Sequence, residues 1–139
     1  MASLIGFYSL SLGAFTSFII TFFSIKNFKN FQTIDNRIFY FSFLQFFLVL
    51  ISFLGLIFSF INSDFSNETV FNNSHTTKPL FYKITGTWGN HEGSLLLWLL
   101  VLTLFVVMFI FKSNRQPIRY RILTLLFQQI IIFGFFIFV

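Results

Sequence analysis

The side chains with the widest chemical range lie in one segment, residues 64–98. This segment holds both histidines, both tryptophans and three of the four acidic residues of the 139-residue chain. Toward its end, His91 stands between Trp88 and Glu92. A neutral imidazole can ligate haem iron, hydrogen-bond a propionate or relay a proton. His91, Trp88 and Glu92 are therefore the candidate cofactor-binding residues.

A structural role for the same residues is the competing interpretation. His91 would then cap or pack at a helix entrance, where Glu92 complements the positive end of the helix dipole. Trp88 would anchor the chain at a membrane interface, where its ring lies in the apolar region and its N–H can hydrogen-bond in the polar region.

Other site chemistry finds little support. Cysteine is absent, which excludes disulfides, thiolate metal sites and covalent haem attachment to this chain. A zinc-protease helix would need a histidine four residues after His91, where Leu95 stands. A shared metal or haem ligation by His75 and His91 is a weak alternative. We predict no catalytic residue and no metal site.

The composition is that of a membrane protein. Hydrophobic residues make up 56% of the chain and charged residues only 9%, with 26 phenylalanines. Ordinary soluble domains carry about a quarter charged residues. The net charge of +5 is spread through an apolar chain, so it indicates membrane topology and no nucleic-acid partner.

Four stretches contain no Asp, Glu, Lys or Arg: 2–25, 38–63, 93–111 and 122–139. Each is near the roughly 20 residues that a spanning helix needs. We predict an all-α membrane protein, a single membrane domain over 1–139 with four transmembrane helices and a long functional loop at 64–92. A cleaved signal peptide at the first stretch and a β-barrel are weaker alternatives.

The connections differ in charge. Basic residues gather in two of them, as Lys26, Lys29 and Arg37 in 26–37 and as Lys112, Arg115, Arg119 and Arg121 in 112–121. By the positive-inside rule these two connections face the cytoplasm or matrix. The N-terminus, loop 64–92 and the C-terminus then face the periplasm or intermembrane space.

Polar and small residues inside the spans predict helix contacts. Small side chains recur along the first and second spans, with one glutamine, at Ser9, Gly13, Ser17 and Thr21 and at Gln45, Ser52, Gly55 and Ser59. These faces are expected to pack on each other or on a partner. Gln128 and Gln129 need a hydrogen-bonding partner in hydrocarbon, for which another chain is a ready source.

The loop has a predicted helix of its own. Pro79 is suited to begin a short interfacial helix in which Leu80, Ile84 and Trp88 form an apolar stripe on the membrane surface.

The run 73–98, NSHTTKPLFYKITGTWGNHEGSLLLW, resembles the N-terminal region of the CcmF family of cytochrome c-type haem lyases. The family carries an Asn-Ser pair, a Pro-Leu-aromatic-Tyr step and a WGxHEGSLLLW motif. That motif is matched here from Trp88 to Trp98. Family members often have glycine where this chain has Asn90, and the bulkier residue is expected to alter the turn.

The resemblance also has a limit. The tryptophan-rich haem-handling segment of the family, WGxxWxWDxxEN, is absent from this chain. Family members are several times longer, with a dozen or more spans. The resemblance therefore implies the N-terminal portion of a split haem lyase, and the role of axial haem ligand is not carried onto His91.

The resemblance implies a function for the whole complex. Haem comes from a chaperone, and its vinyl groups are joined to the CxxCH thiols of apocytochrome c. This chain is expected to assist as a subunit beside other lyase fragments in the mitochondrial inner membrane, with no catalysis of its own. The alternative is a non-catalytic accessory subunit of a respiratory-chain complex. A small transporter is weaker still, because no ionisable residue lies within a span.

Overall fold

The structure is a computed structural model that describes residues 2–30 and 36–139. All of its regular elements are helical, and none of the described residues lies in a strand. The elements are α1 (Ala2–Asn30), α2 (Asn36–Ile61), α3 (Glu68–Asn73), α4 (Leu80–Gly86), α5 (His91–Lys112), the 3-10 turn η1 (Ser113–Arg115) and α6 (Ile118–Phe138). Four of them, α1, α2, α5 and α6, are long and apolar enough to cross a membrane.

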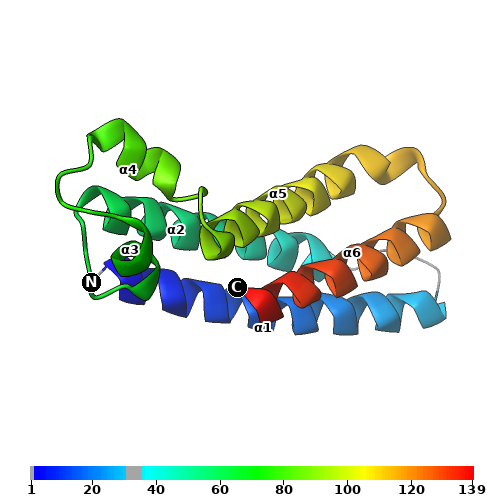
Figure 1. The fold of residues 1–139 in the computed structure, drawn as a ribbon. Helices are drawn as coiled ribbons and strands as arrows, with labels where there is room; N and C mark the ends of the chain where they lie inside the picture. The colour runs from blue at the N-terminus through cyan, green and yellow to red at the C-terminus, as the bar shows by residue number, and fades with distance from the viewer. Residues whose placement is uncertain (1, 31–35) are drawn as a thin grey trace.

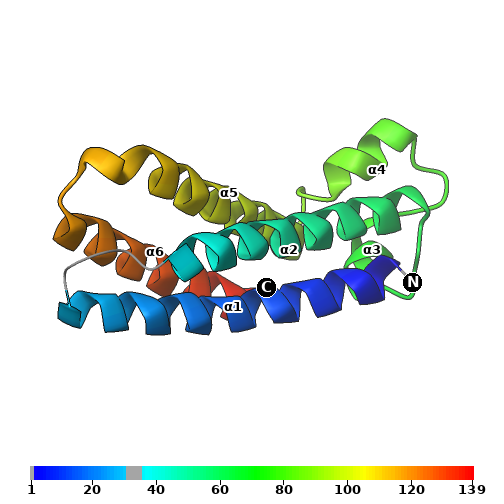
Figure 2. The ribbon, with the colours of Figure 1, turned by 180° about the vertical axis from the view of Figure 1, so that it is seen from behind.

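The long helices form an antiparallel bundle (Figures 1 and 2). Helix α1 packs against α2 and α6, and α5 packs against α2 and α6. The four helices thus form a closed ring in the order α1, α2, α5, α6. The all-α membrane fold with four spans and a long helix-containing loop, predicted from the sequence, is confirmed.

The bundle has two different ends. We call the end where α1 is joined to α2 and α5 to α6 the basic end, because it carries Lys26, Arg37, Lys112, Arg115 and Arg119. Helices α3 and α4 lie at the opposite end, here the loop end (Figure 1). The first connection, 26–37, includes residues 31–35, which lie outside the described residues.

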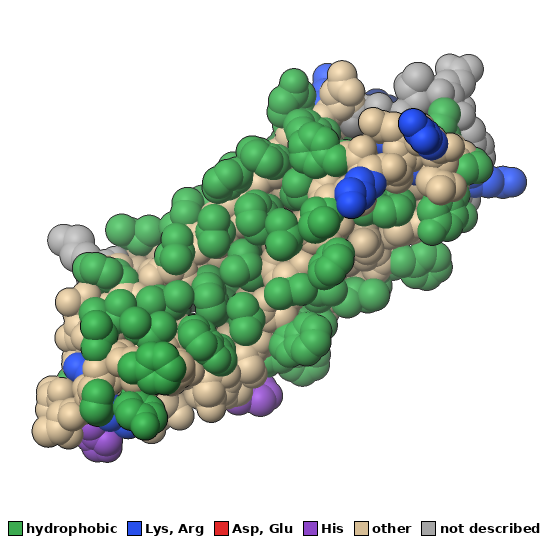
Figure 3. All heavy atoms as spheres, turned by 90° about the horizontal axis from the view of Figure 1, so that it is seen from above, with side chains coloured by type: hydrophobic (Ala, Val, Ile, Leu, Met, Phe, Trp, Pro, Cys, Tyr) green, Lys and Arg blue, Asp and Glu red, His purple; other side chains and the backbone are tan. Residues whose placement is uncertain are grey.

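The outer surface is apolar between these ends. Large hydrophobic side chains face outward on every long helix, including Phe7 and Phe22 of α1, Phe105 of α5 and Phe127 of α6. On the face shown in Figure 3, Lys and Arg are most prominent toward one end. Histidine lies toward the other end with some Lys or Arg atoms beside it, and hydrophobic side chains cover most of the length between them. In a soluble protein such a surface would be an aggregation hazard, whereas in a bilayer it is the lipid-facing belt.

Small residues bring α1 and α2 close together. A Cβ added to Gly55 would lie 3.2 Å from the carbonyl oxygen of Ala2, and one added to Gly6 would lie 3.5 Å from that of Ser52. Ser9 and Ser17 of the predicted face are buried, as are Ser52 and Ser59 on the other side. Of the two expectations for these faces, packing on each other is what the structure shows.

A buried amide cluster joins three of the four spans. Gln45 of α2 donates a 2.6 Å hydrogen bond to the Ser17 hydroxyl of α1, and the Gln129 amide of α6 donates a 3.2 Å bond back to the Gln45 carbonyl oxygen. Ser17 also donates to the Gln129 carbonyl oxygen over 3.2 Å. The two glutamines are fully buried. The partner of Gln129 therefore lies in this chain and not in another one, whereas the buried Oε1 of Gln128 has no hydrogen-bond partner among the described residues.

Replacing Gln129 with leucine should destabilise the bundle. The change leaves the Gln45 amide without its reciprocal partner, at a cost of about 1–2 kcal/mol in the free energy of unfolding. Unfolding of the chain in mixed detergent micelles, followed by circular dichroism, measures it. Gln128→Leu is the matched control, because it removes an unpaired carbonyl oxygen and should be neutral or stabilising. Equal losses from the two variants would contradict a specific role for the cluster.

Candidate functional site

Two lysines hold the loop between α2 and α5 together, and one of them joins α4 to the end of α2. The Lys83 ammonium of α4 donates a 2.6 Å hydrogen bond to the hydroxyl of Ser63, just after α2. The Lys78 ammonium donates to the backbone carbonyl of Asn73, at the end of α3, over 2.8 Å. The Cβ position of Gly86 faces the ring of Phe60 on α2. These contacts place α4 alongside α2 (Figure 1).

The loop begins with a short polar turn. The Ser66 hydroxyl donates a 2.6 Å hydrogen bond to the carboxylate of Asp64, and the Ser66 backbone N–H donates a second over 3.3 Å. Both bonds favour the charged carboxylate, so the pKa of Asp64 lies below its ordinary value, chiefly because of the hydroxyl. The stabilisation of this turn by the two hydrogen bonds is present above the unfolded-state pKa of Asp64. It is lost as the pH falls through the lowered pKa of the folded state.

Helix α3 was not expected from the sequence. Asn67 caps it by accepting a 3.0 Å hydrogen bond from the backbone N–H of Thr69, and Glu68 supplies a negative charge in its first turn. Both are ordinary signals of a helix N-terminus. Asn67 and Glu68 are therefore the sequence signal for this helix.

Helix α4 matches the predicted short helix only in part. It follows Pro79, as expected, but it ends at Gly86. Trp88 therefore lies beyond the helix and is not part of a helical stripe with Leu80 and Ile84. The glycine that weakens a helix interior is the residue at which this helix ends.

Asn90 joins the end of α4 to the start of α5. Its side-chain oxygen accepts a 2.7 Å hydrogen bond from the backbone N–H of Gly93, which makes it the N-cap of α5. Its amide nitrogen donates to the carbonyl oxygens of Gly86 and Thr87 over 2.8 and 3.2 Å. Asn90 thus caps α5 and holds the end of α4, and the expected difference from a turn with glycine at this position stays a prediction. Sequence reasoning missed this role, although asparagine before a helix is a standard cap.

Gly93 allows the closest backbone approach in the motif. A Cβ on this residue would overlap the carbonyl oxygen of Thr87. The first turn of α5 therefore rests directly on the backbone that follows α4. Gly93 and Thr87 are both buried, while the residues between them reach the surface.

The three predicted site residues lie around this turn. His91 and Glu92 are the first two residues of α5 and are exposed, and 39% of the Trp88 surface is exposed. Within the part of the chain that the structure describes, the His91 imidazole and the Trp88 indole N–H form no hydrogen bond. Glu92 lines a pocket on the side of α1. The site therefore offers an open imidazole and an indole ring, with the carboxylate directed toward a different surface.

His75 is also exposed, in the turn between α3 and α4. Residues 2–30 and 36–139 contain no group of three or more His, Cys, Asp or Glu side chains that could hold a metal ion.

The chain is similar to proteins of cytochrome c biogenesis. It is 46% identical over 95 residues to the cytochrome c-type biogenesis protein ccl1 of Rhodobacter capsulatus, which covers 68% of this chain and 14% of the relative. It is 41% identical over 91 residues to CcmF of Haemophilus influenzae, covering 64% and 14%. A solved structure of the cytochrome c haem lyase CcmF matches 98% of this chain with a TM-score of 0.84 and 26% identity.

The chain belongs to the CcmF family. A carrot protein described as a probable cytochrome c biosynthesis protein is also similar, at 40% identity over 73 residues, which covers 52% of this chain and 12% of the relative. A scan against models of protein families found no match. The chain spans about one seventh of the length of the bacterial CcmF relatives and 23% of the solved lyase chain. It is thus a multi-pass membrane protein that corresponds to one part of a larger lyase fold.

Replacing Gly93 with alanine should disrupt the turn that presents Trp88 and His91. The added methyl group overlaps a backbone oxygen that cannot move without shifting α4, so we expect a loss of about 1–3 kcal/mol in the free energy of unfolding. Gly89→Ala is the matched control, because its Cβ would lie 3.4 Å from the nearest atom, an ordinary contact. Denaturant unfolding of both variants in detergent provides the comparison, and an undisturbed Gly93→Ala would contradict the close approach.

Proposed function

We propose that this chain is a subunit of a cytochrome c haem lyase and that it assists haem handling and the covalent attachment of haem to apocytochrome c. The observation that carries the proposal is the match of nearly the whole chain to the solved haem lyase CcmF. The WGNHEGSLLLW motif adds specific support, because its residues form the turn before α5 and the first part of that helix at the loop end.

The roles of the side chains follow from their exposure. The His91 imidazole is open to a ligand and is suited to contact haem iron or a propionate. The exposed ring of Trp88 offers a flat apolar surface for a porphyrin. Haem, as the substrate, would supply the vinyl groups that become bonded to the cytochrome. This chain has no cysteine, so the thiols of the reaction come from apocytochrome c.

Glu92 has a separate role in this proposal. Its carboxylate would repel a haem propionate, and neighbouring residues on a helix do not face each other. We therefore place haem on the side of Trp88 and His91. A haem chaperone and the other lyase subunits complete the site, because this chain alone covers only 23% of the matched lyase.

We propose the mitochondrial inner membrane as the location, with the loop end toward the intermembrane space. The bundle supports this orientation, since the basic residues gather at the opposite end, which the positive-inside rule assigns to the matrix. The chain would act there as one membrane domain.

His91 can be tested against the second histidine of the same loop. His91→Ala should lower covalent haem attachment to cytochrome c at least about tenfold if its imidazole orients or binds haem. His75→Ala, also exposed and in the same loop, should leave attachment near the normal level. Haem staining of cytochrome c after denaturing electrophoresis measures both. Normal attachment in His91→Ala, or after deletion of 73–98, would reject the proposal.

The orientation can be tested with single cysteines, since the natural chain contains none. A cysteine at the exposed Thr76 should react with a membrane-impermeant maleimide from the intermembrane-space side of mitoplasts. A cysteine at the exposed Asn114, near the basic end, should react only after the membrane is permeabilised. The opposite pattern would reverse the proposed topology.

A further inference from the structure

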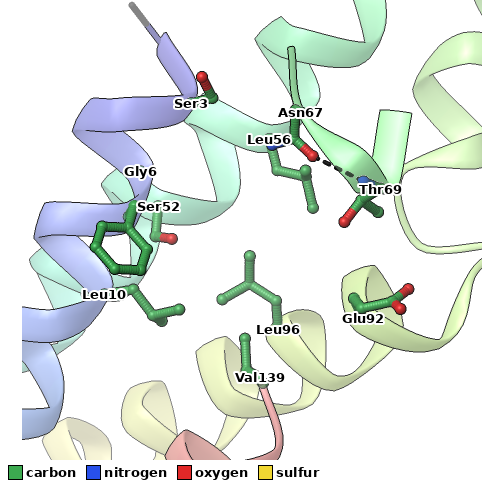
Figure 4. Close-up of a pocket in the computed structure, with 11 residues that line it drawn as sticks. Ser3, Gly6, Leu10, Ser52, Leu56, Asn67, Thr69, Glu92, Leu96 and Val139 are labelled. Atoms are coloured by element: carbon green, nitrogen blue, oxygen red, sulfur yellow. Dashed lines mark hydrogen bonds between the residues drawn. The ribbon is translucent and has the colours of Figure 1, made fainter. Parts of the chain in front are cut away.

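A small pocket at the loop end lies between α1, α2, α3 and α5 (Figure 4). Its volume is about 220 Å³, which is below the roughly 300–1,000 Å³ of typical small-molecule sites. Leu10, Leu56, Leu96 and Val139 surround the hollow. They come from α1, α2, α5 and the residue that follows α6. The pocket is thus an apolar recess in the side of the bundle.

One edge of this recess carries a charge. Glu92 lines the pocket, beside the polar Thr69 and Asn67 of the α3 turn. Thr69 and Asn67 are hydrogen-bonded to each other through the α3 cap. The Glu92 carboxylate has no hydrogen bond or ion pair within residues 2–30 and 36–139. A negative charge beside an apolar recess is complementary to a group that combines an apolar body with a cation.

We propose that this recess is a docking site for a transmembrane helix of another lyase polypeptide, which inserts an apolar side chain and pairs a lysine or arginine with Glu92. The proposal rests on the proposed function, because the partner is the remainder of a lyase fold of which this chain covers 23%. The small volume suits one or two side chains of a helix. It does not suit a porphyrin, and the carboxylate opposes propionates.

The recess also lies where a partner helix can reach it. Phe7 lines the pocket on α1 and is 65% exposed, so the recess opens to the lipid-facing side of the bundle. Gly6 and Ser52 line the wall beside it. Both are buried where α1 and α2 approach each other. The water-facing edge, where Glu92 lies, is the level at which a lysine or arginine at a helix end can meet it.

Photo-crosslinking in membranes that carry out cytochrome c maturation tests this assignment. Benzoylphenylalanine in place of Phe7 keeps an aromatic ring at the pocket, and the same residue in place of Phe22 is the control. Phe22 is on the same helix, is also 65% exposed and lies outside the pocket. Position 7 should crosslink to another lyase polypeptide. Glu92→Gln should lower that yield about three- to fivefold, as loss of a partly exposed ion pair would, and leave position 22 unchanged.

A charge exchange confirms the pairing. Glu92→Lys should abolish the crosslink from position 7, and a glutamate in place of the basic residue nearest the crosslinked peptide should restore it. Crosslinking to phospholipid alone would assign the recess to a lipid and overturn the proposal. A yield that is unaffected by Glu92→Gln would also overturn it.

Haem attachment measured in the same membranes separates the two proposals. No polypeptide crosslink at position 7, together with normal His91-dependent attachment, would reject the docking site and leave the lyase role intact. A crosslink to a respiratory-complex subunit, with attachment unaffected by His91→Ala, would reject the lyase role.

Discussion

The hydrogen bonds among Gln45, Gln129 and Ser17 are the constraint on which the bundle depends. In hydrocarbon an unpaired amide costs several kcal/mol, so each glutamine specifies where its partner helix must lie. The cluster fixes α1, α2 and α6 at one level, because its donors and acceptors satisfy each other only in that register. Apolar packing alone would distinguish weakly between registers, since lipid tails are as apolar as the side chains they replace.

The register set in the bundle carries through to the loop end. The close approach of α1 and α2 at Gly6 and Gly55 fixes the end of α2 relative to α1. Helix α4 can then pack beside that end. Asn90 and Gly93 then hold the start of α5 against the end of α4. The position of His91 is therefore determined by backbone contacts and a cap rather than by contacts of its own imidazole. Such an arrangement keeps the ring available to a ligand.

Much of the fold could be predicted from the sequence, and the reasons are physical. Charged residues are excluded from the bilayer core, and clustered basic residues mark the ends of spans on one side. The four spans and the two ends of the bundle could therefore be predicted from the positions of the charges. The partner of Gln129 could not be predicted in this way. Its polarity shows that a partner is needed, but not which of several polar residues provides it. The closed cluster with Gln45 depends on helix rotation, which the sequence pattern leaves open.

Short-range details of the site were harder to predict for a different reason. Helix α3, the end of α4 at Gly86 and the cap at Asn90 each depend on one or two residues, and such weak signals compete with many alternatives in a polar loop. The need for glycine at position 93 is tertiary, because it comes from a carbonyl oxygen six residues earlier. The motif could therefore be found as a pattern, but its geometry could not be derived from that pattern.

The distribution of satisfied and unsatisfied groups explains how one part of a lyase fold can be an ordered unit. Within the described residues, the central amides of three spans are paired with one another, so those spans have a reason to assemble in this register before any other chain arrives. Among the described residues, the groups without partners include the Gln128 carbonyl oxygen, the Glu92 carboxylate and the His91 imidazole. The Gln128 carbonyl oxygen is buried, whereas Glu92 and His91 are exposed at the start of α5. A bundle whose central amides are paired, while the exposed Glu92 and His91 side chains are not, is suited to stable insertion first and association afterwards. Each exposed group gains by binding without being required for the fold.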